Sequence, residues 1–149
     1  MGFKKSFEIR KAKKIDLKQI SEILRIESAK KPYVQKWTKK TALERVSELS
    51  KKQIIHVALV DDKIIGFITS LIKDKGVYVD EFWITKKFQR KGIGNKLINT
   101  VEEFYKDKGA KTIGLMANQK AGAVKFYKKM GYSPKHTFFY MSKKIRSKK

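Results

Sequence analysis

The residues best suited to chemistry form a short run at positions 89–95, which reads Gln-Arg-Lys-Gly-Ile-Gly-Asn. Gly92 and Gly94 let the backbone turn tightly and come close to a ligand. Free backbone N–H groups at the start of the following helix attract anions, and the helix dipole adds to that attraction. Arg90 and Lys91 supply positive charge beside them. The run predicts a pyrophosphate site, and the alternative is an ordinary turn that happens to carry glycine.

Two known nucleotide-binding motifs do not fit this run. A dinucleotide-binding fingerprint needs a Gly or Ala where Leu97 stands, and it normally occupies the first strand–helix unit of a chain. A P-loop needs Gly-Lys followed by Ser or Thr, which the run lacks. Both classes of nucleotide-binding protein are therefore excluded.

Hydrophobic periodicity predicts the elements that must position the run. Three consecutive strands come before it, and alternating helices and strands follow it, which implies a mixed α/β sheet with helices on both faces. Thr41 and Glu44 have the spacing of a capping box at the start of one helix. We expect strands over 6–12, 54–60, 64–72, 77–85, 111–117 and 136–142, and helices after Asp16, after Thr41, over 93–105 and over 121–130.

Length and composition limit the class of protein. The 149 residues fit a single domain over 1–149, with a basic tail from about Lys143. No apolar run approaches the roughly 20 residues that span a bilayer, which excludes a transmembrane protein. The chain has no Cys, so disulfides, thiolate metal sites and Cys nucleophiles are excluded. His56 and His136 have no partners at ligand spacing, and we expect no metal.

The formal net charge of +23 arises from 37 Lys and Arg residues against 14 Asp and Glu residues. It fits nucleic-acid binding, an anionic ligand such as a nucleotide cofactor, or a Lys-rich composition without a functional meaning. The Lys residues are spread along the chain and form no stripe, which favours the last interpretation. No signal-peptide pattern is visible, and we expect a cytoplasmic location.

A strand followed by Gln-x-x-Gly-x-Gly resembles the acetyl-CoA loop of the GCN5-related N-acetyltransferase (GNAT) family. Residues 78–85 resemble that family's fourth strand, which runs directly into the loop. Residues 120–132, with Ala123, Tyr127 and Gly131, resemble its later Asn-x-x-Ala-x-x-x-Tyr-x-x-x-Gly-Phe segment. The two motifs come in the right order and at the right spacing, and residues 7–17 resemble the family's opening, so the resemblance covers nearly the whole chain.

The resemblance implies a mixed sheet of about six to seven strands that splays open between two parallel strands, with acetyl-CoA in the cleft. The implied reaction is direct transfer of an acetyl group from the thioester to a primary amine. The acceptor is either a polyamine or other small amine, or the N-terminal or Lys amine of a protein. The alternative function is a GNAT-fold binding module that has lost turnover and binds RNA through its basic surface. A homodimer is left open, and no membrane partner is expected.

The resemblance also assigns roles to residues. Tyr127 falls on the family's acid, which protonates the departing thiolate, although its spacing beside Phe126 also fits the core. Asp80 and Glu81 are the candidate bases, and only one should reach the cleft unless a bulge intervenes, because neighbours on a strand point to opposite faces. The expected cofactor-binding residues are Phe82, Trp83, Ile84, Gln89, Arg90, Lys91, Gly92, Ile93, Gly94, Asn95, Asn118, Lys120 and Tyr127.

The sequence departs from the family pattern at two places. The usual Asn of the later segment falls on Lys120, which can only donate hydrogen bonds, whereas Asn118 stands two residues earlier. Leu115 occupies a position where some acetyltransferases of ribosomal N-termini carry a Glu. Trp37 and Trp83 fit the core better than a substrate pocket.

Overall fold

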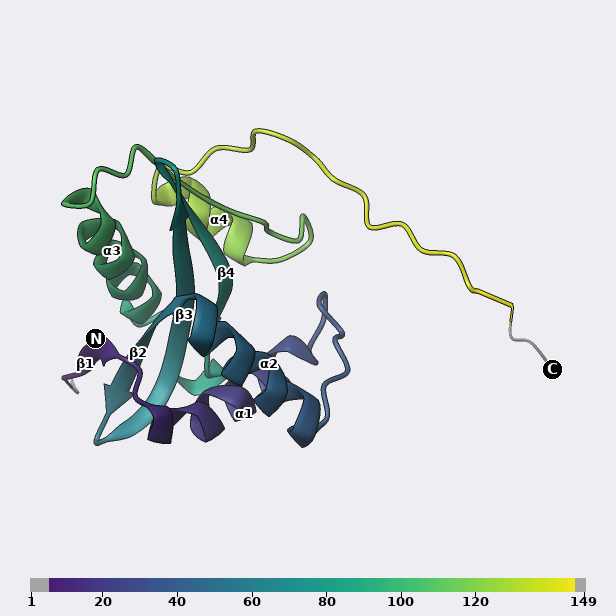
Figure 1. The fold of residues 1–149 in the computed structure, drawn as a ribbon, viewed down its shortest axis with the longest axis horizontal. Coiled ribbons are helices and arrows are strands. Elements are labelled where there is room, and N and C mark those ends of the chain that lie inside the picture. Colours follow the sequence, from purple (N-terminus) through teal and green to yellow (C-terminus); the bar gives the residue numbers. More distant parts are fainter. Residues whose placement is uncertain (1–5, 147–149) are drawn as a thin grey trace.

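A five-stranded sheet forms the centre of the computed structural model, which describes residues 6–146 (Figure 1). Its strands follow the order β1-β2-β3-β4-β5, and β5 runs parallel to β4 whereas the other neighbours are antiparallel. The predicted mixed α/β class is therefore confirmed. The strands are β1 (Glu8–Lys11), β2 (Ile54–Val60), β3 (Lys63–Lys73), β4 (Gly76–Ile84) and β5 (Thr112–Leu115).

Helices cover both faces of the sheet, as predicted (Figure 1). Buried side chains of α1 and α2, such as Leu24 and Val46, pack against Phe67 of β3 on one face. On the other face, α3 packs against Ile68 and its neighbours. Because both faces are covered, β2 and β3 read as nearly continuous apolar runs. The helices are α1 (Leu17–Ser28), α2 (Lys39–Lys52), α3 (Ile93–Lys106) and α4 (Ala123–Lys129), with 3-10 turns at Lys14–Asp16 and Lys86–Phe88.

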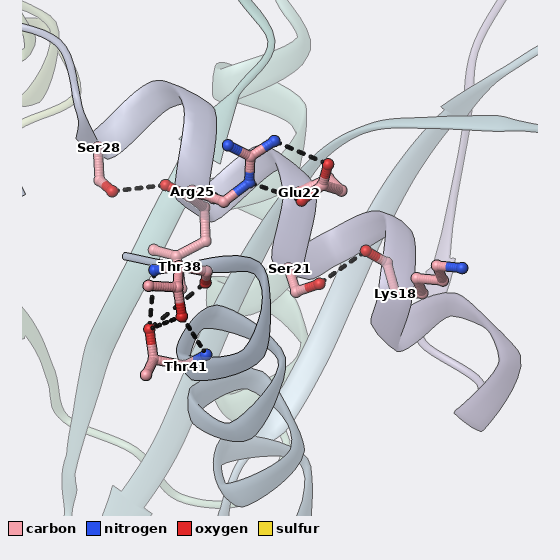
Figure 2. Close-up of polar contacts among 8 residues, drawn as sticks. Lys18, Ser21, Glu22, Arg25, Ser28, Thr38 and Thr41 are labelled. Atoms are coloured by element: carbon pink, nitrogen blue, oxygen red, sulfur yellow. Dashed lines mark hydrogen bonds and ion pairs between the residues drawn. The ribbon is translucent and has the colours of Figure 1, made fainter. Parts of the chain in front are cut away.

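Helix α2 starts one turn earlier than predicted, because Thr38 and not Thr41 is its N-cap. The Thr41 N–H donates to Thr38 Oγ1 at 3.0 Å, and the Thr38 N–H donates to Thr41 Oγ1 at 2.9 Å (Figure 2). This reciprocal pair satisfies two N–H groups that a helix start otherwise leaves free. The capping box has the expected spacing of three residues, but it runs from Thr38 to Thr41. The predicted pairing of Thr41 with Glu44 is wrong.

The predicted strand over 136–142 is wrong. This segment is extended and exposed, and it pairs with no strand among residues 6–146. The sheet therefore has five strands and not six or seven. Alternation and β-propensity report that a segment can fit a sheet, but a strand also needs a partner. Residues 143–146 of the predicted basic tail are exposed as well, and 147–149 lie outside the described residues.

None of the helices within residues 6–146 has the length and apolar character required to cross a membrane. The two longest, α2 and α3, have 14 residues each, and both carry charged side chains along one face. The apolar face of each helix packs on the sheet instead.

Candidate active site

The parallel strands β4 and β5 separate halfway along β4. Their pairing runs from Gly76 opposite Thr112 to Val79 opposite Leu115, where β5 ends. β4 continues for five residues, to Ile84, with β3 on one edge and no strand on the other within the described part of the chain. Backbone groups along that second edge therefore have no strand partner. The splay between two parallel strands is where the resemblance to the GNAT family predicts it.

Helix α4 lies across this opening from β4. The Phe82 ring centroid lies 6.3 Å from that of Phe126 and 6.3 Å from that of Tyr127. A further ring, that of Tyr132, lies 5.9 Å from Tyr127. Tyr127 is half-buried among these rings, and none of the hydrogen bonds among the described residues involves its hydroxyl. Burial raises the pKa of Tyr127, and the nearby Tyr33 raises it further. The phenol therefore stays protonated and can donate.

The predicted glycine run forms the connection from β4 to α3. Gly92 is the N-cap of α3 with φ +84°, a conformation that L side chains rarely adopt, and a Cβ there would meet no heavy atom within 4 Å. The first N–H bonded within the helix is that of Lys96, which donates to Gly92 O at 3.2 Å. The earlier N–H groups of Ile93, Gly94 and Asn95 have no carbonyl of the preceding turn to bond, so they are suited to an anion.

The second glycine has a different role. A Cβ on Gly94 would lie 3.2 Å from Ile84 Cδ1 and 3.5 Å from Phe126 Cζ. Gly94 therefore lets the start of α3 pack closely on the end of β4, whereas Gly92 leaves open space for a ligand. Ile93, between them, is fully buried in the core and anchors the helix.

A hollow of about 610 Å³ lies beside the first turns of α3. It is wide open to solvent and lies outside the opening between β4 and β5, so it is not the place where bonds would change. Asn95 on its rim accepts a hydrogen bond from Asn99 Nδ2 at 2.8 Å. The lining residues are Gly92, Asn95, Lys96, Asn99, Thr100 and Glu103.

Gln89 joins the loop to β4 and α1 from an exposed position. Its Nε2 donates to Ile84 O at 2.7 Å and to Glu27 Oε1 at 3.4 Å. The same carboxylate accepts from the Lys86 N–H at 3.4 Å and from Lys30 Nζ at 3.0 Å. The Gln89 side chain thus braces the loop against β4 and α1, while the side chains of Arg90 and Lys91 are exposed.

Glu27 is a residue that the sequence reasoning missed. It is only 6% exposed, and its carboxylate joins α1 to the loop after β4. A signal was available in the sequence, because Glu27 lies three and seven residues after the buried Leu24 and Ile20, on the apolar face of α1. A charged residue on such a face needs partners, and these lie in the loop.

A bulge in β4 brings both candidate bases to one side of the strand. Ile68 pairs with Phe82 and Ser70 pairs with Val79, so Asp80 and Glu81 together oppose Thr69. The Glu81 N–H donates to Thr69 Oγ1 at 3.0 Å, which fixes the bulge. This is the exception to strand alternation that the sequence left open.

The two carboxylates share Arg45 of α2 but differ in exposure. Arg45 Nη2 lies 3.0 Å from Glu81 Oε2 and 3.4 Å from Asp80 Oδ1. Glu81 Oε1 also accepts from Trp83 Nε1 at 2.7 Å, and its side chain is 11% exposed. The Asp80 side chain is 44% exposed and accepts from Gln53 Nε2 at 2.9 Å. Both oxygens of each carboxylate therefore have a partner, and the difference is that Asp80 is the more exposed of the two and can be reached from solvent.

The connection between α1 and α2 closes the site near these carboxylates. The Tyr33 ring meets the Trp83 ring edge-on, with centroids 4.8 Å apart. Trp83 and Trp37 are both partly buried against the core of the α1–α2 face, as predicted for core residues, but Trp83 also borders the site. Tyr33 is a second residue that the sequence reasoning missed.

The remaining predicted positions lie before α4 or away from the opening. Asn118 Oδ1 accepts from the Lys120 N–H at 2.9 Å, so the Asn118 side chain shapes the turn into α4, and both residues are exposed. His56 is buried beside Phe104, and His136 is exposed in the C-terminal segment. Among residues 6–146, no three His, Asp or Glu side chains gather as a metal site would require.

Comparisons with known proteins agree with this geometry. A family model described as an acetyltransferase (GNAT) domain matches residues 18–142. An uncharacterized N-acetyltransferase of Methanocaldococcus jannaschii is 30% identical over 87 residues. That match covers 53% of this chain and only 38% of the relative's length.

Solved structures share the fold over almost the whole chain. An aminoglycoside N-acetyltransferase in complex with CoA matches with a TM-score of 0.76 and 15% identity, covering 97% of this chain and 99% of that one. The PaiA N-acetyltransferase of Thermoplasma acidophilum, in complex with coenzyme A, matches with a TM-score of 0.77 and 23% identity, covering 89% and 93%. These matches confirm the predicted fold, and the family model, which spans most of the sequence, confirms the predicted family. The chain belongs to the GNAT family of acetyltransferases.

Proposed function

We propose that this protein is an N-acetyltransferase that moves an acetyl group directly from acetyl-CoA to a primary amine. The observation that carries the proposal is the unpaired edge of β4 after Val79, which faces Tyr127 and leads into the loop at Gly92. Structures of the same fold hold CoA, which supports this cosubstrate. Acetyl-CoA supplies an activated thioester, and the protein supplies the groups that bind it and move protons.

The proposed binding site follows the two parts of the cosubstrate. The N–H groups at the start of α3, with Arg90 and Lys91 beside them, suit the anionic pyrophosphate. The backbone edge of β4 over Phe82 and Trp83, which has no strand partner within the described residues, suits the amide-bearing arm, which can pair as a short strand would. At Ile84 the carbonyl oxygen already accepts from Gln89 Nε2. A strand N–H on this edge would also face the thioester oxygen, where negative charge develops.

The proposed reaction needs three proton movements, because the acceptor nitrogen loses two protons and the departing sulfur gains one. The acceptor ammonium loses a proton to Asp80, directly or through water, and its nitrogen attacks the thioester carbon. The new C–N bond forms as the C–S bond breaks, and Tyr127 donates its proton to the departing sulfur. The acetylated nitrogen then gives up its second proton, which returns through water to the Tyr127 phenolate, so that a neutral amide, a free thiol and a protonated Tyr127 result. Glu81 is assigned a positioning role, because its side chain is only 11% exposed and is held by Arg45 and Trp83, whereas the Asp80 side chain is 44% exposed.

The acceptor side of the site favours a cationic amine at short range. Asp80 provides a partly exposed carboxylate, and the rings of Tyr33 and Trp83 lie nearby. Ammonium groups are attracted both to carboxylates and to aromatic faces. The net charge of +23 repels cations at long range, but salt screens charges that lie beyond about 8 to 10 Å. Polyamines and protein amines both satisfy this chemistry.

The function is tested by incubating the protein with acetyl-CoA and a panel of amines that contains polyamines, aminoglycosides and peptides. We expect release of free thiol together with an acetylated amine of the expected mass for at least one class. Peptides with a blocked N-terminus separate transfer to Lys from transfer to the N-terminus. If CoA binds but no amine on the panel is acetylated, the enzymatic proposal fails and the binding-module alternative takes its place.

The loop assignment predicts that Gly92→Ala weakens the binding of acetyl-CoA by at least about tenfold. The added Cβ projects into open space where the pyrophosphate would lie, and one lost charge-assisted hydrogen bond costs about 1.5 to 3 kcal/mol. The matched control is Gly109→Ala, because Gly109 has φ +80° and equally open surroundings beyond the far end of α3. Calorimetric titration measures both. Equal affinity in wild type and Gly92→Ala would place the pyrophosphate elsewhere.

The acid assignment predicts that Tyr127→Phe lowers kcat by about 10²- to 10⁴-fold while KM for acetyl-CoA stays nearly constant. The matched control is Tyr132→Phe, which removes the hydroxyl that donates to Glu102 Oε2 at 2.8 Å. That variant should lose about 1 kcal/mol of folding free energy and keep its rate per folded molecule. Single-turnover rates and thermal melts separate the two effects. Acetyl transfer at wild-type speed in folded Tyr127→Phe would remove Tyr127 from the mechanism.

The base assignment predicts a pH-dependent defect in Asp80→Asn. The loss of rate should be largest below the pKa of the acceptor amine, where the amine must give up a proton, and should shrink above it. Glu81→Gln weakens the contact with Arg45, so its defect should persist at every pH. Glu48→Gln changes an exposed carboxylate of α2 and serves as the control. A wild-type pH–rate profile in Asp80→Asn would transfer the role to water or to Glu81.

A further inference from the structure

Gln53 lies where α2 ends and β2 begins, and its side chain reaches the candidate base. The Gln53 N–H caps α2 by donating to Leu49 O at 2.8 Å, and β2 starts at the next residue, Ile54. The side-chain Nε2 donates to Asp80 Oδ2 at 2.9 Å. The backbone of Gln53 is therefore held by a helix and by a strand, and its amide crosses to a third element, β4.

This amide lies closer to Asp80 than the guanidinium of Arg45 does. Arg45 Nη2 lies 3.4 Å from Asp80 Oδ1 but only 3.0 Å from Glu81 Oε2, to which Arg45 Nε also donates at 3.3 Å. The guanidinium is thus directed mainly at Glu81. Gln53 holds the other oxygen of Asp80 and carries no charge. A neutral donor fixes the carboxylate without cancelling the negative charge that attracts an ammonium.

The other polar atom of the Gln53 amide has no partner. Gln53 Oε1 is buried and accepts no hydrogen bond from the described residues. If the amide were turned over, Oε1 would face the Asp80 carboxylate, and two hydrogen-bond acceptors would meet. An unpaired buried acceptor costs free energy, and a methionine of the same length would avoid that cost. The stability of the fold therefore does not explain an amide at this position, whereas its contact with Asp80 does.

The contact also limits how the Asp80 side chain can turn. Asp80 lies in the bulge of β4 and its side chain is 44% exposed, so without a partner it could adopt several rotamers in solvent. A base acts only within hydrogen-bond reach of the proton that it removes. Holding one oxygen through Gln53 reduces this freedom, and the remaining lone pairs of the carboxylate stay available to an incoming amine.

We propose that Gln53 is a positioning residue for the acetyl transfer, because it holds Asp80 in the orientation that receives a proton from the acceptor ammonium. The inference rests on the proposed function, in which Asp80 is the base. Gln53 acts through Asp80 and not on acetyl-CoA, so its loss should slow proton removal and leave cofactor binding unchanged.

The first test is the pH dependence of acetyl transfer in Gln53→Met, which keeps the length of the side chain and removes its hydrogen bonds. We expect kcat to fall about tenfold below the pKa of the acceptor amine, as for the loss of one hydrogen bond to a charged group, and to approach the wild-type value above it. KM for acetyl-CoA should stay constant. The melting temperature should not fall, because the unpaired buried oxygen is removed as well.

The matched control is Gln19→Met. Gln19 Oε1 accepts from the Ile64 N–H at 3.2 Å, so this side chain joins α1 to β3 and not to the strand that carries Asp80. The same substitution there should keep the wild-type pH–rate profile.

The second test is a double-mutant cycle that shows whether Gln53 acts through Asp80. Asp80→Ala removes the carboxylate, so adding Gln53→Met to it should lower the single-turnover rate no further. The proposal is overturned if Gln53→Met loses the same factor at every pH, if it matches the wild type throughout, or if it costs tenfold again in Asp80→Ala. Each of these results leaves the proposed function intact, provided that the wild type acetylates an amine. A wild-type protein that binds acetyl-CoA and acetylates no amine overturns the proposed function itself, and this inference with it.

Discussion

The early end of β5 is the constraint on which the rest of the site depends. Hydrogen bonds between β4 and β5 stop at Val79 and Leu115, and β4 continues alone to Ile84. A parallel pair of equal length would fill the space in which a thioester could lie. The β4 bulge begins at the next residue, Asp80, so the edge loses its neighbour where its carboxylates turn toward α2. The end of the β4–β5 pairing and the bulge that carries the two carboxylates thus fall at consecutive residues of one strand.

A few polar contacts join helices α1 and α2 to β4 and the loop after it, which lie far away in the sequence. Glu27 ties α1 to the loop through the Lys86 N–H and Gln89, and Arg45 ties α2 to Asp80 and Glu81. The carboxylates of Glu27 and Glu81 are largely desolvated, and their partners offset that cost only when the geometry is held. Helices α1 and α2 therefore hold β4 and the loop after it in place. A change in their packing would alter both the loop at Gln89 and the bulge at Asp80 and Glu81.

The sequence predicted what depends on local pattern. Periodicity placed the four helices and the strands β1 to β5, and glycine spacing identified the turn at Gly92. The sequence alone did not predict the contacts between distant segments. The bulge at Asp80 and Glu81 depends on Thr69 in the neighbouring strand, and the role of Glu27 depends on a loop about sixty residues later. Gly94 was predicted as a ligand-contacting residue, and the sequence did not show that a Cβ there would also crowd Ile84 and Phe126.

The C-terminal segment illustrates the same limit. Its pattern was that of a strand, but alternation and β-propensity report only that a segment can fit a sheet. Residues 136–142 pair with no strand within residues 6–146. β5 has four residues and one neighbouring strand, and seven residues separate it from α4, which carries Tyr127. The position of the Tyr127 ring therefore depends on its contacts with Phe82, Phe126 and Tyr132, which strand pairing does not predict.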